Sequence, residues 1–161
     1  MKNLIVYASK HGCAEKCAAQ LGSRLQGETR VVNIKDAAAE NPAGYDAVVI
    51  GGSIHAGRIQ KTVQRFAAQH IGLLNTKRVG LFLCCMEEGD KAETQFAGAF
   101  PEDLITTAVA KGLFGGAFDF ERMNWLEKKI IARISGVKAS VSKIKDENIE
   151  AFARAMNGTA S

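Results

Sequence analysis

Apolar runs alternate with amphipathic stretches along the whole chain. Five runs rich in β-branched residues predict strands, over residues 4–8, 30–34, 47–50, 79–84 and 110–118. The first, third and fourth of these runs lack in-out alternation, which is expected of strands covered on both faces of a parallel sheet.

Helical periodicity fills the intervals between these runs. Apolar stripes predict helices over residues 14–25, 61–71, 123–134 and 147–156, and a weaker helix over 101–108. Strands and helices that alternate in this way form βαβ units with right-handed crossovers. We therefore expect a single domain over residues 1–161, with an α/β, doubly wound, three-layer fold.

Composition narrows the class of protein. The chain has 161 residues, of which 47% are hydrophobic and 24% are charged. This mixture is that of an ordinary globular domain, and it excludes a disordered tail, a collagen-like repeat and a disulfide-rich mini-protein. No apolar run approaches the roughly 20 residues of a membrane span, and the first one is too short for a signal peptide. We therefore expect a cytoplasmic protein, with no nucleic-acid partner.

The four cysteines show no pattern of a metal site. Cys13, Cys17, Cys84 and Cys85 form neither a CxxC pair nor a set with zinc-binding histidines. We expect reduced thiols in a reducing compartment and no bound metal. Cys13 lies at a predicted helix start, where a thiol is either reactive, because that position lowers its pKa, or simply a small residue that fills the loop.

The loop after the first predicted strand has the composition of an anion site. Ligands of doubly wound folds bind at the carboxyl ends of the strands. The residues there are Ser9, Lys10, His11, Gly12, Cys13 and Ala14, directly before a helix. Backbone N–H groups and the positive helix end favour an anion at such a place. The loop matches neither GxGxxG nor GxxxxGK[ST], so it predicts a site for one phosphate monoester; a tight turn without a ligand is the alternative.

Two further loops follow predicted strands at the same edge. After the third strand, two glycines allow close approach of a flat ligand, and Ser53, His55 and Arg58 offer polar groups. His55 is either a ligand contact or a surface residue of the loop. After the fourth strand, Glu87 and Glu88 either accept hydrogen bonds from a ligand or are solvated.

These motifs resemble the flavodoxin-like superfamily over essentially the whole chain. The resemblance rests on Ser9-x-x-Gly12-x-Ala14 between a strand and a helix, and on Gly51-Gly52-Ser53 after the third strand. It implies a five-stranded parallel sheet in the order 2-1-3-4-5 and FMN as the cofactor. At two positions of this loop the family usually has Thr. Here these positions are occupied by His11 and Ala14.

The resemblance also implies which residues contact FMN. The phosphate contacts would be residues 9–14, and the flavin would be flanked by the second loop and, at its pyrimidine edge, by the third. The residues of these two loops are Ser53, Ile54, His55, Ala56, Gly57, Cys85, Met86, Glu87 and Glu88. Neither loop contains a Trp, Tyr or Phe, so the ring should be less tightly covered than in flavodoxins. No residue is marked as a catalytic base.

A narrower resemblance is to the menaquinone-dependent protoporphyrinogen oxidases. It rests on Gly51-Gly52-Ser53-Ile54-His55-Ala56-Gly57, on Gly115-Gly116-Ala117-Phe118, on Trp125 and on Lys129-Ile130-Ile131-x-x-Ile134-Ser135-Gly136. It implies an FMN-dependent oxidoreductase that passes electrons through flavin to a quinone-type acceptor, with protoporphyrinogen IX as the substrate. The alternative is a flavodoxin-like electron carrier without a substrate of its own.

The excess of basic over acidic residues is confined to one segment. Residues 119–145 hold seven basic and three acidic residues and thus carry the whole net charge of +4. Arg122, Lys129 and Arg133 form a stripe on the predicted helix, beside an apolar face. Either this face packs on the sheet and the stripe is simply solvated, or the stripe rests with Trp125 on anionic lipid, or it attracts a carboxylate-bearing partner. The second option places helix 122–134 at the inner face of the membrane.

Overall fold

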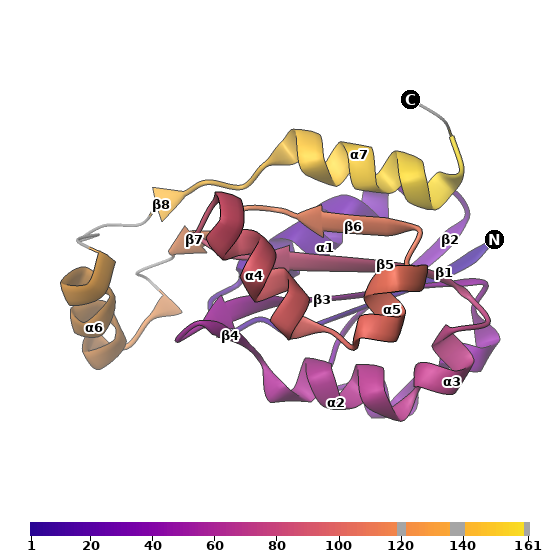
Figure 1. The fold of residues 1–161 in the computed structure, drawn as a ribbon, viewed down its shortest axis with the longest axis horizontal. Helices are drawn as coiled ribbons and strands as arrows, with labels where there is room; N and C mark the ends of the chain where they lie inside the picture. Colours follow the sequence, from indigo (N-terminus) through magenta and orange to yellow (C-terminus); the bar gives the residue numbers. More distant parts are fainter. Residues whose placement is uncertain (119–121, 136–140, 160–161) are drawn as a thin grey trace.

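The computed structural model describes residues 1–118, 122–135 and 141–159, and Figure 1 shows its ribbon. A parallel sheet in the order β2-β1-β3-β5-β6 forms its centre. These strands are β1 (Lys2–Tyr7), β2 (Glu28–Asn33), β3 (Ala47–His55), β5 (Arg78–Cys84) and β6 (Ala110–Leu113). A two-residue side strand, β4 (Arg58–Ile59), pairs antiparallel with β3. The five-stranded order 2-1-3-4-5 is therefore confirmed, with β4 as an addition.

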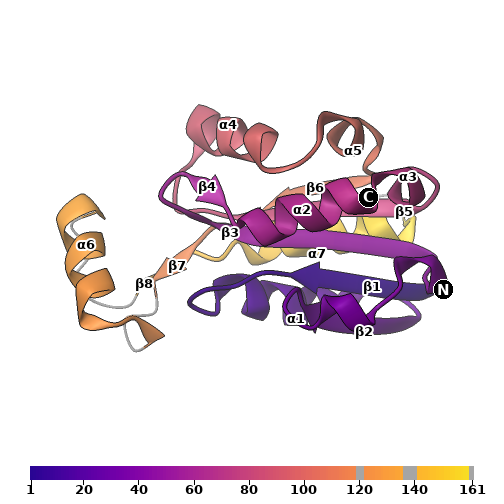
Figure 2. The same cartoon turned by 90° about the horizontal axis from the view of Figure 1, so that it is seen from below.

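Helices cover both faces of the sheet (Figures 1 and 2). On one face lie α1 (Cys13–Arg24) and α7 (Asp146–Asn157). The other face is covered by α2 (Lys61–Gln69), α3 (Ile71–Leu74), α4 (Gly89–Ala99) and α5 (Glu102–Thr107). Two single turns of 3-10 helix, Ala37–Ala39 and Pro42–Gly44, connect β2 to β3.

Aromatic packing joins the middle of the sheet to α7. The ring of Phe114 stacks on that of Phe82 with centroids 4.9 Å apart, and it meets Phe152 edge-on at 5.3 Å. Gly51 lies opposite Phe82 in the register, and a Cβ there would overlap the Phe82 ring. The absence of a side chain at Gly51 thus lets the ring lie against β3.

Strand β3 is longer than its apolar run predicts. The prediction ended it at Ile50, whereas it continues through Gly52 and Ser53, which pair with Leu83 and Cys84 of β5. Residues 54 and 55 then pair with β4 through a two-residue turn at Ala56 (φ 50°) and Gly57 (φ 76°). Two positive φ angles are what a tight hairpin requires, so residues 51–57 are strand and turn and not an open loop.

The fifth predicted strand, residues 110–118, is divided in two. β6 ends at Leu113, and β7 (Ala117–Phe118) pairs with β8 (Val141–Ser142) in a separate two-stranded sheet. The break falls at Gly115, whose φ of 76° turns the backbone. A glycine can adopt this left-handed conformation at little cost, so the Gly115-Gly116 pair interrupts an otherwise continuous apolar run.

Helix α4 was not predicted. Its apolar stripe consists of Ala92, Phe96 and Ala99, which pack against the sheet. The spacing i, i+4, i+7 is a helical signal, but two of the three residues are alanines and the stripe is weak.

Helix α6 (Trp125–Ser135) projects from the end of the body at which the central strands finish (Figures 1 and 2). It begins two residues later than predicted, after Asn124, whose side chain caps Glu127 N–H at 2.8 Å. Leu126 and Ile130 are 51% and 47% exposed, although Met123 before the helix is buried, so the structure does not favour the alternative in which this whole face packs on the sheet. Arg122 precedes the helix, and the rest of the predicted basic segment at 119–121 and 136–140 lies outside the described residues. No described helix has both the length and the hydropathy to cross a bilayer.

Candidate functional site

The three segments predicted to bind a ligand follow β1, β3 and β5. Because these strands are parallel neighbours, their carboxyl ends meet at one edge of the sheet. The first two segments come together: the rings of His11 and His55 lie 5.5 Å apart, edge to face. The edge thus forms one site from distant parts of the chain.

The first segment, residues 9–14, is a tight turn that leads into α1. The Ser9 hydroxyl accepts a hydrogen bond from the Gly12 N–H at 2.9 Å, which leaves the hydroxyl proton to donate. Gly12 adopts φ 89° and precedes the first residue of α1, Cys13. The side chains of Cys13 and Ala14 are buried in the core, so these two residues can meet a ligand only through their backbone. The geometry is that of an anion-binding helix start.

A carboxylate already lies against the cations of this turn. Glu127 of α6 places one oxygen 2.9 Å from His11 Nε2 and the other 3.5 Å from Lys10 Nζ. Arg122 lies over Gly12 and forms an ion pair with Glu15 at 3.2 Å. The segment before and within α6 therefore covers the turn, and its carboxylate serves as a stand-in anion.

The second segment offers polar atoms without partners. Ser53 Oγ, His55 Nε2 and His11 Nδ1 are buried, and none has a hydrogen-bond partner within the described ranges. The backbone here is held by Gln60, whose side-chain oxygen accepts from Ser53 N–H at 3.1 Å. Buried polar groups are normally satisfied, so these three atoms are available to hydrogen-bond a ligand at this edge.

His55 is a neutral imidazole at physiological pH. Burial disfavours its charged form, and the nearby His11 and Lys10 add to the effect, so its pKa is lowered to about 4. A neutral imidazole can both donate and accept a hydrogen bond.

The third segment, Cys85 to Glu88, makes its contacts elsewhere. Cys85 donates its N–H to Gly115 O at 2.9 Å, and a Cβ on Gly116 would collide with Met86 Sδ. Glu87 and Glu88 are exposed and face Lys91 and Lys145 at 3.9 and 3.5 Å. Within the described residues, these contacts hold the segment against α4 and the chain after β6, and none joins it to His11 or His55.

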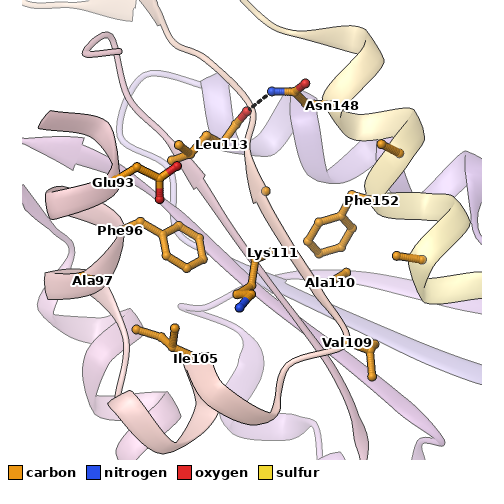
Figure 3. Close-up of a pocket in the computed structure, with 13 residues that line it drawn as sticks. Glu93, Phe96, Ala97, Ile105, Val109, Ala110, Lys111, Leu113, Asn148 and Phe152 are labelled. Carbon is orange, nitrogen blue, oxygen red and sulfur yellow. Dashed lines mark hydrogen bonds between the residues drawn. The ribbon is translucent and has the colours of Figure 1, made fainter. Parts of the chain in front are cut away.

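A separate hollow of about 690 Å³ lies along the open edge of β6, between α4, α5 and α7 (Figure 3). Phe96, Ile105 and Phe152 line it, and Asn148 donates to Leu113 O across its end at 2.7 Å. None of its lining residues carries a buried polar atom without a partner, as far as the structure describes them. The hollow therefore lacks the buried unpartnered atoms that Ser53, His55 and His11 offer at the loop edge.

Sequence reasoning missed Glu127 as part of the site. Glu127 lies far from His11 in the chain, so no local spacing connects the two residues. The pattern Asn124-x-x-Glu127 is a recognisable helix start, which could have placed the helix at Trp125. The contact of Glu127 with the first turn arises only from the tertiary packing.

Comparison with known proteins identifies the class of protein. The sequence model of the flavodoxin domain matches residues 4–144. The chain therefore belongs to the flavodoxin family, whose cofactor is FMN and whose fold serves electron transfer. No functionally curated protein is significantly similar in sequence.

Solved flavodoxin structures share the fold from end to end. The flavodoxin of Streptococcus pneumoniae TIGR4 is 19% identical with a TM-score of 0.63, covering 98% of this chain and 99% of its own. Flavodoxin 1 of Bacillus cereus is 18% identical with a TM-score of 0.61 and full coverage of both chains. Megasphaera elsdenii flavodoxin is 15% identical with a TM-score of 0.61, covering 98% of this chain and 99% of its own.

The residues present fit FMN at the loop edge. The turn of residues 9–12 already holds a carboxylate, and the second segment has unsatisfied donors and acceptors at the same edge. The buried thiols of Cys13, Cys17 and Cys84 lie beneath it. The predicted contacts of residues 9–12, 53 and 55 thus fall in one place, whereas Glu87 and Glu88 are solvent-facing.

The lowered pKa of His55 predicts a pH dependence of stability. Between pH 6.5 and about 4 the unfolded chain binds more protons at this residue than the folded chain, so the free energy of unfolding falls as the pH is lowered. We expect His55→Gln to reduce this loss, measured by urea unfolding at pH 7 and pH 5. Ser53→Ala, which removes no titratable group, should keep the loss of the unaltered protein. Equal losses in His55→Gln and the unaltered protein would contradict the assignment.

Proposed function

We propose that this chain binds FMN at the loops after β1, β3 and β5 and acts as an FMN-dependent oxidoreductase. Electrons pass through the flavin to a quinone-type acceptor, with protoporphyrinogen IX as the donor. The observation that carries the proposal is the contact of the Glu127 carboxylate with the side chains of Lys10 and His11 in the turn before α1. The narrower substrate rests on the resemblance of residues 51–57 and 115–136 to the protoporphyrinogen oxidases.

The first turn would hold the FMN phosphate. Lys10 and His11 supply positive charge, the Ser9 hydroxyl supplies a donor, and the first N–H groups of α1 supply the helix end. Glu127 competes for this place, because its carboxylate occupies the same two cations. Binding of the phosphate therefore requires Glu127 to withdraw.

The second segment would hold the flavin ring. When bound, FMN supplies a ring that accepts electrons at N5 and releases them to a second acceptor. Ser53 and neutral His55 gain hydrogen-bond partners there, and Ile54, Ala56 and Gly57 present backbone and apolar surface. Residues 85–88 would lie at the pyrimidine edge through their backbone, since the Glu87 and Glu88 side chains face solvent.

Two observations bear on whether the protein is an oxidoreductase or an electron carrier without its own substrate. The exposed apolar residues of α6 lie on the same helix as Glu127, so a bilayer that holds a quinone would be brought next to the flavin loops. The end-to-end likeness to flavodoxin structures supports the second candidate, an electron carrier without its own substrate.

The loop assignment predicts changes in FMN affinity. Lys10→Ala should weaken FMN binding about tenfold or more, because a hydrogen bond to a charged group contributes about 1.5–3 kcal/mol. Ser9→Ala should weaken it less, and Glu127→Gln should strengthen it, since it removes the competing charge. Quenching of FMN fluorescence during titration of flavin-free protein measures all three.

The matched control is Lys2→Ala, which removes the same charge at the opposite end of β1. Unchanged affinity in both Lys10→Ala and Ser9→Ala would contradict the phosphate assignment. Weaker FMN binding by Glu127→Gln than by the unaltered protein would show that Glu127 assists FMN binding and does not compete with the phosphate.

An oxidation assay separates the enzyme from the carrier. Protein loaded with FMN is mixed with protoporphyrinogen IX and a menaquinone analogue, and the fluorescence of protoporphyrin is followed. We expect a rate above that of the same protein without FMN. A rate equal to the uncatalysed oxidation would remove the oxidase and leave the carrier.

Helix α6 has the surface of a peripheral membrane contact. Trp125, Leu126 and Ile130 are 73%, 51% and 47% exposed, and Lys128, Lys129 and Arg133 stand on the same helix. Apolar side chains enter the interface between headgroups and acyl chains, and each nearby cation contributes about 1 kcal/mol at an anionic surface. We propose that α6 rests on anionic lipid.

The single tryptophan of the chain reports this contact directly. Anionic vesicles should shift the Trp125 emission to the blue and sediment the protein, and rising salt should reverse both effects. Lys128→Glu with Lys129→Glu should abolish binding, whereas Lys35→Glu with Lys61→Glu, the same charge change on other elements, should weaken it only slightly. Equal binding to neutral vesicles would contradict the electrostatic account.

A further inference from the structure

Three of the four thiols converge although their spacing in the sequence does not suggest it. Cys13 and Cys17 lie one turn apart on α1, and Cys84 is the last residue of β5. The three Sγ atoms all lie within 4.8 Å of one another. Because α1 packs over β5, residues from two distant segments form one sulfur cluster.

The cluster is sealed from water. Cys13, Cys17 and Cys84 are 8%, 0% and 2% exposed, and Tyr7, Phe82 and Phe114 belong to the same apolar core. No further His, Cys, Asp or Glu joins the group among the residues that the structure describes. An ion placed there would have three sulfur ligands and no carboxylate or imidazole of the described residues as a fourth.

One of the three sulfurs lies at the start of a helix. Cys13 is the first residue of α1, where the positive helix end favours a thiolate. Its sulfur accepts hydrogen bonds from the thiols of Cys17 and Cys84 and from the backbone of Ala117, so its pKa is lowered. The two donor thiols correspondingly have raised pKa values.

We propose that Cys13, Cys17 and Cys84 bind one monovalent thiophilic metal ion, Cu(I), through their three sulfur atoms. Thiolates select soft ions such as Cu(I), whereas structural Zn²⁺ almost always takes four ligands, which this cluster does not offer. The ion displaces the protons of Cys17 and Cys84 to the buffer and takes the place of the hydrogen bonds between the sulfurs. It would join the start of α1 to the end of β5.

The site lies beneath the FMN loops but does not rest on the function proposed for them. Cys13 contributes its side chain to the cluster and only its backbone to the turn of residues 9–14. A protein that fails to bind FMN could still bind the ion, and the reverse also holds.

Competition for Cu(I) tests the proposal. Fully reduced protein is titrated with Cu(I) under oxygen-free conditions against a chromogenic Cu(I) chelator. We expect one ion per chain and an increase in the midpoint temperature of unfolding, because a ligand that binds only the folded state stabilises it. Cys17→Ala and Cys84→Ala should each lower the affinity by about a hundredfold or more, beyond what loss of an outer partner of a metal site produces.

The matched control is Cys85→Ala, which removes the neighbouring buried thiol outside the cluster and should leave Cu(I) affinity unchanged. X-ray absorption of the Cu(I)-loaded unaltered protein should show three sulfur neighbours, and this measurement requires no variant to fold. Two sulfur neighbours, tighter binding of Zn²⁺ than of Cu(I), or an equal loss in Cys85→Ala would overturn the proposal.

Discussion

The parallel register of β1, β3 and β5 is the constraint on which the site depends. Adjacent parallel strands end at the same edge, so the turn after Tyr7, the hairpin after His55 and the segment after Cys84 are brought together whatever their sequences. The register in turn depends on close packing, because Phe82 fills the space left by the missing side chain of Gly51. The Phe82 ring stacks on Phe114, which in turn contacts Phe152 of α7. A side chain at Gly51 would thus disturb the site from the core.

Electrostatics then distinguishes the parts of this edge. Lys10 and His11 precede the amino end of α1, where an anion is favoured, and in this structure their side chains contact the carboxylate of Glu127. His55, close to both cations and partly buried, remains neutral. The charge that the sequence concentrates in residues 119–145 is therefore not one uniform basic surface. One of its three acidic residues, Glu127, contacts the turn after β1, while Lys128, Lys129 and Arg133 remain on the projecting helix.

Helix α6 links the edge proposed to bind FMN to the surface proposed to rest on lipid. One of its side chains contacts the turn after β1, and others present apolar and basic groups away from the body. FMN binding and partner docking would consequently act on the same helix. The cluster of Cys13, Cys17 and Cys84 brings the start of α1 into contact with the end of β5. The turn before α1 thus has this cluster on its core side and α6 on its outer side.

The sequence by itself determined the α/β class, the strand order through its resemblance, and the positions of Ser9 and Gly12 between β1 and α1, because these depend on local periodicity and short motifs. The predicted β3 was too short, because its last residues are strand only through their pairing with β4. The prediction also joined β6 to β7, because the separate sheet of β7 depends on pairing with β8. The sequence left open whether the face with Leu126 and Ile130 is buried, because an amphipathic pattern cannot tell whether its apolar face meets the sheet or remains exposed. Only the tertiary structure decided that Glu127 meets His11 and that Cys84 meets Cys13 and Cys17. These contacts join segments far apart in the chain, and the packing of α1, β5 and α6 sets their geometry.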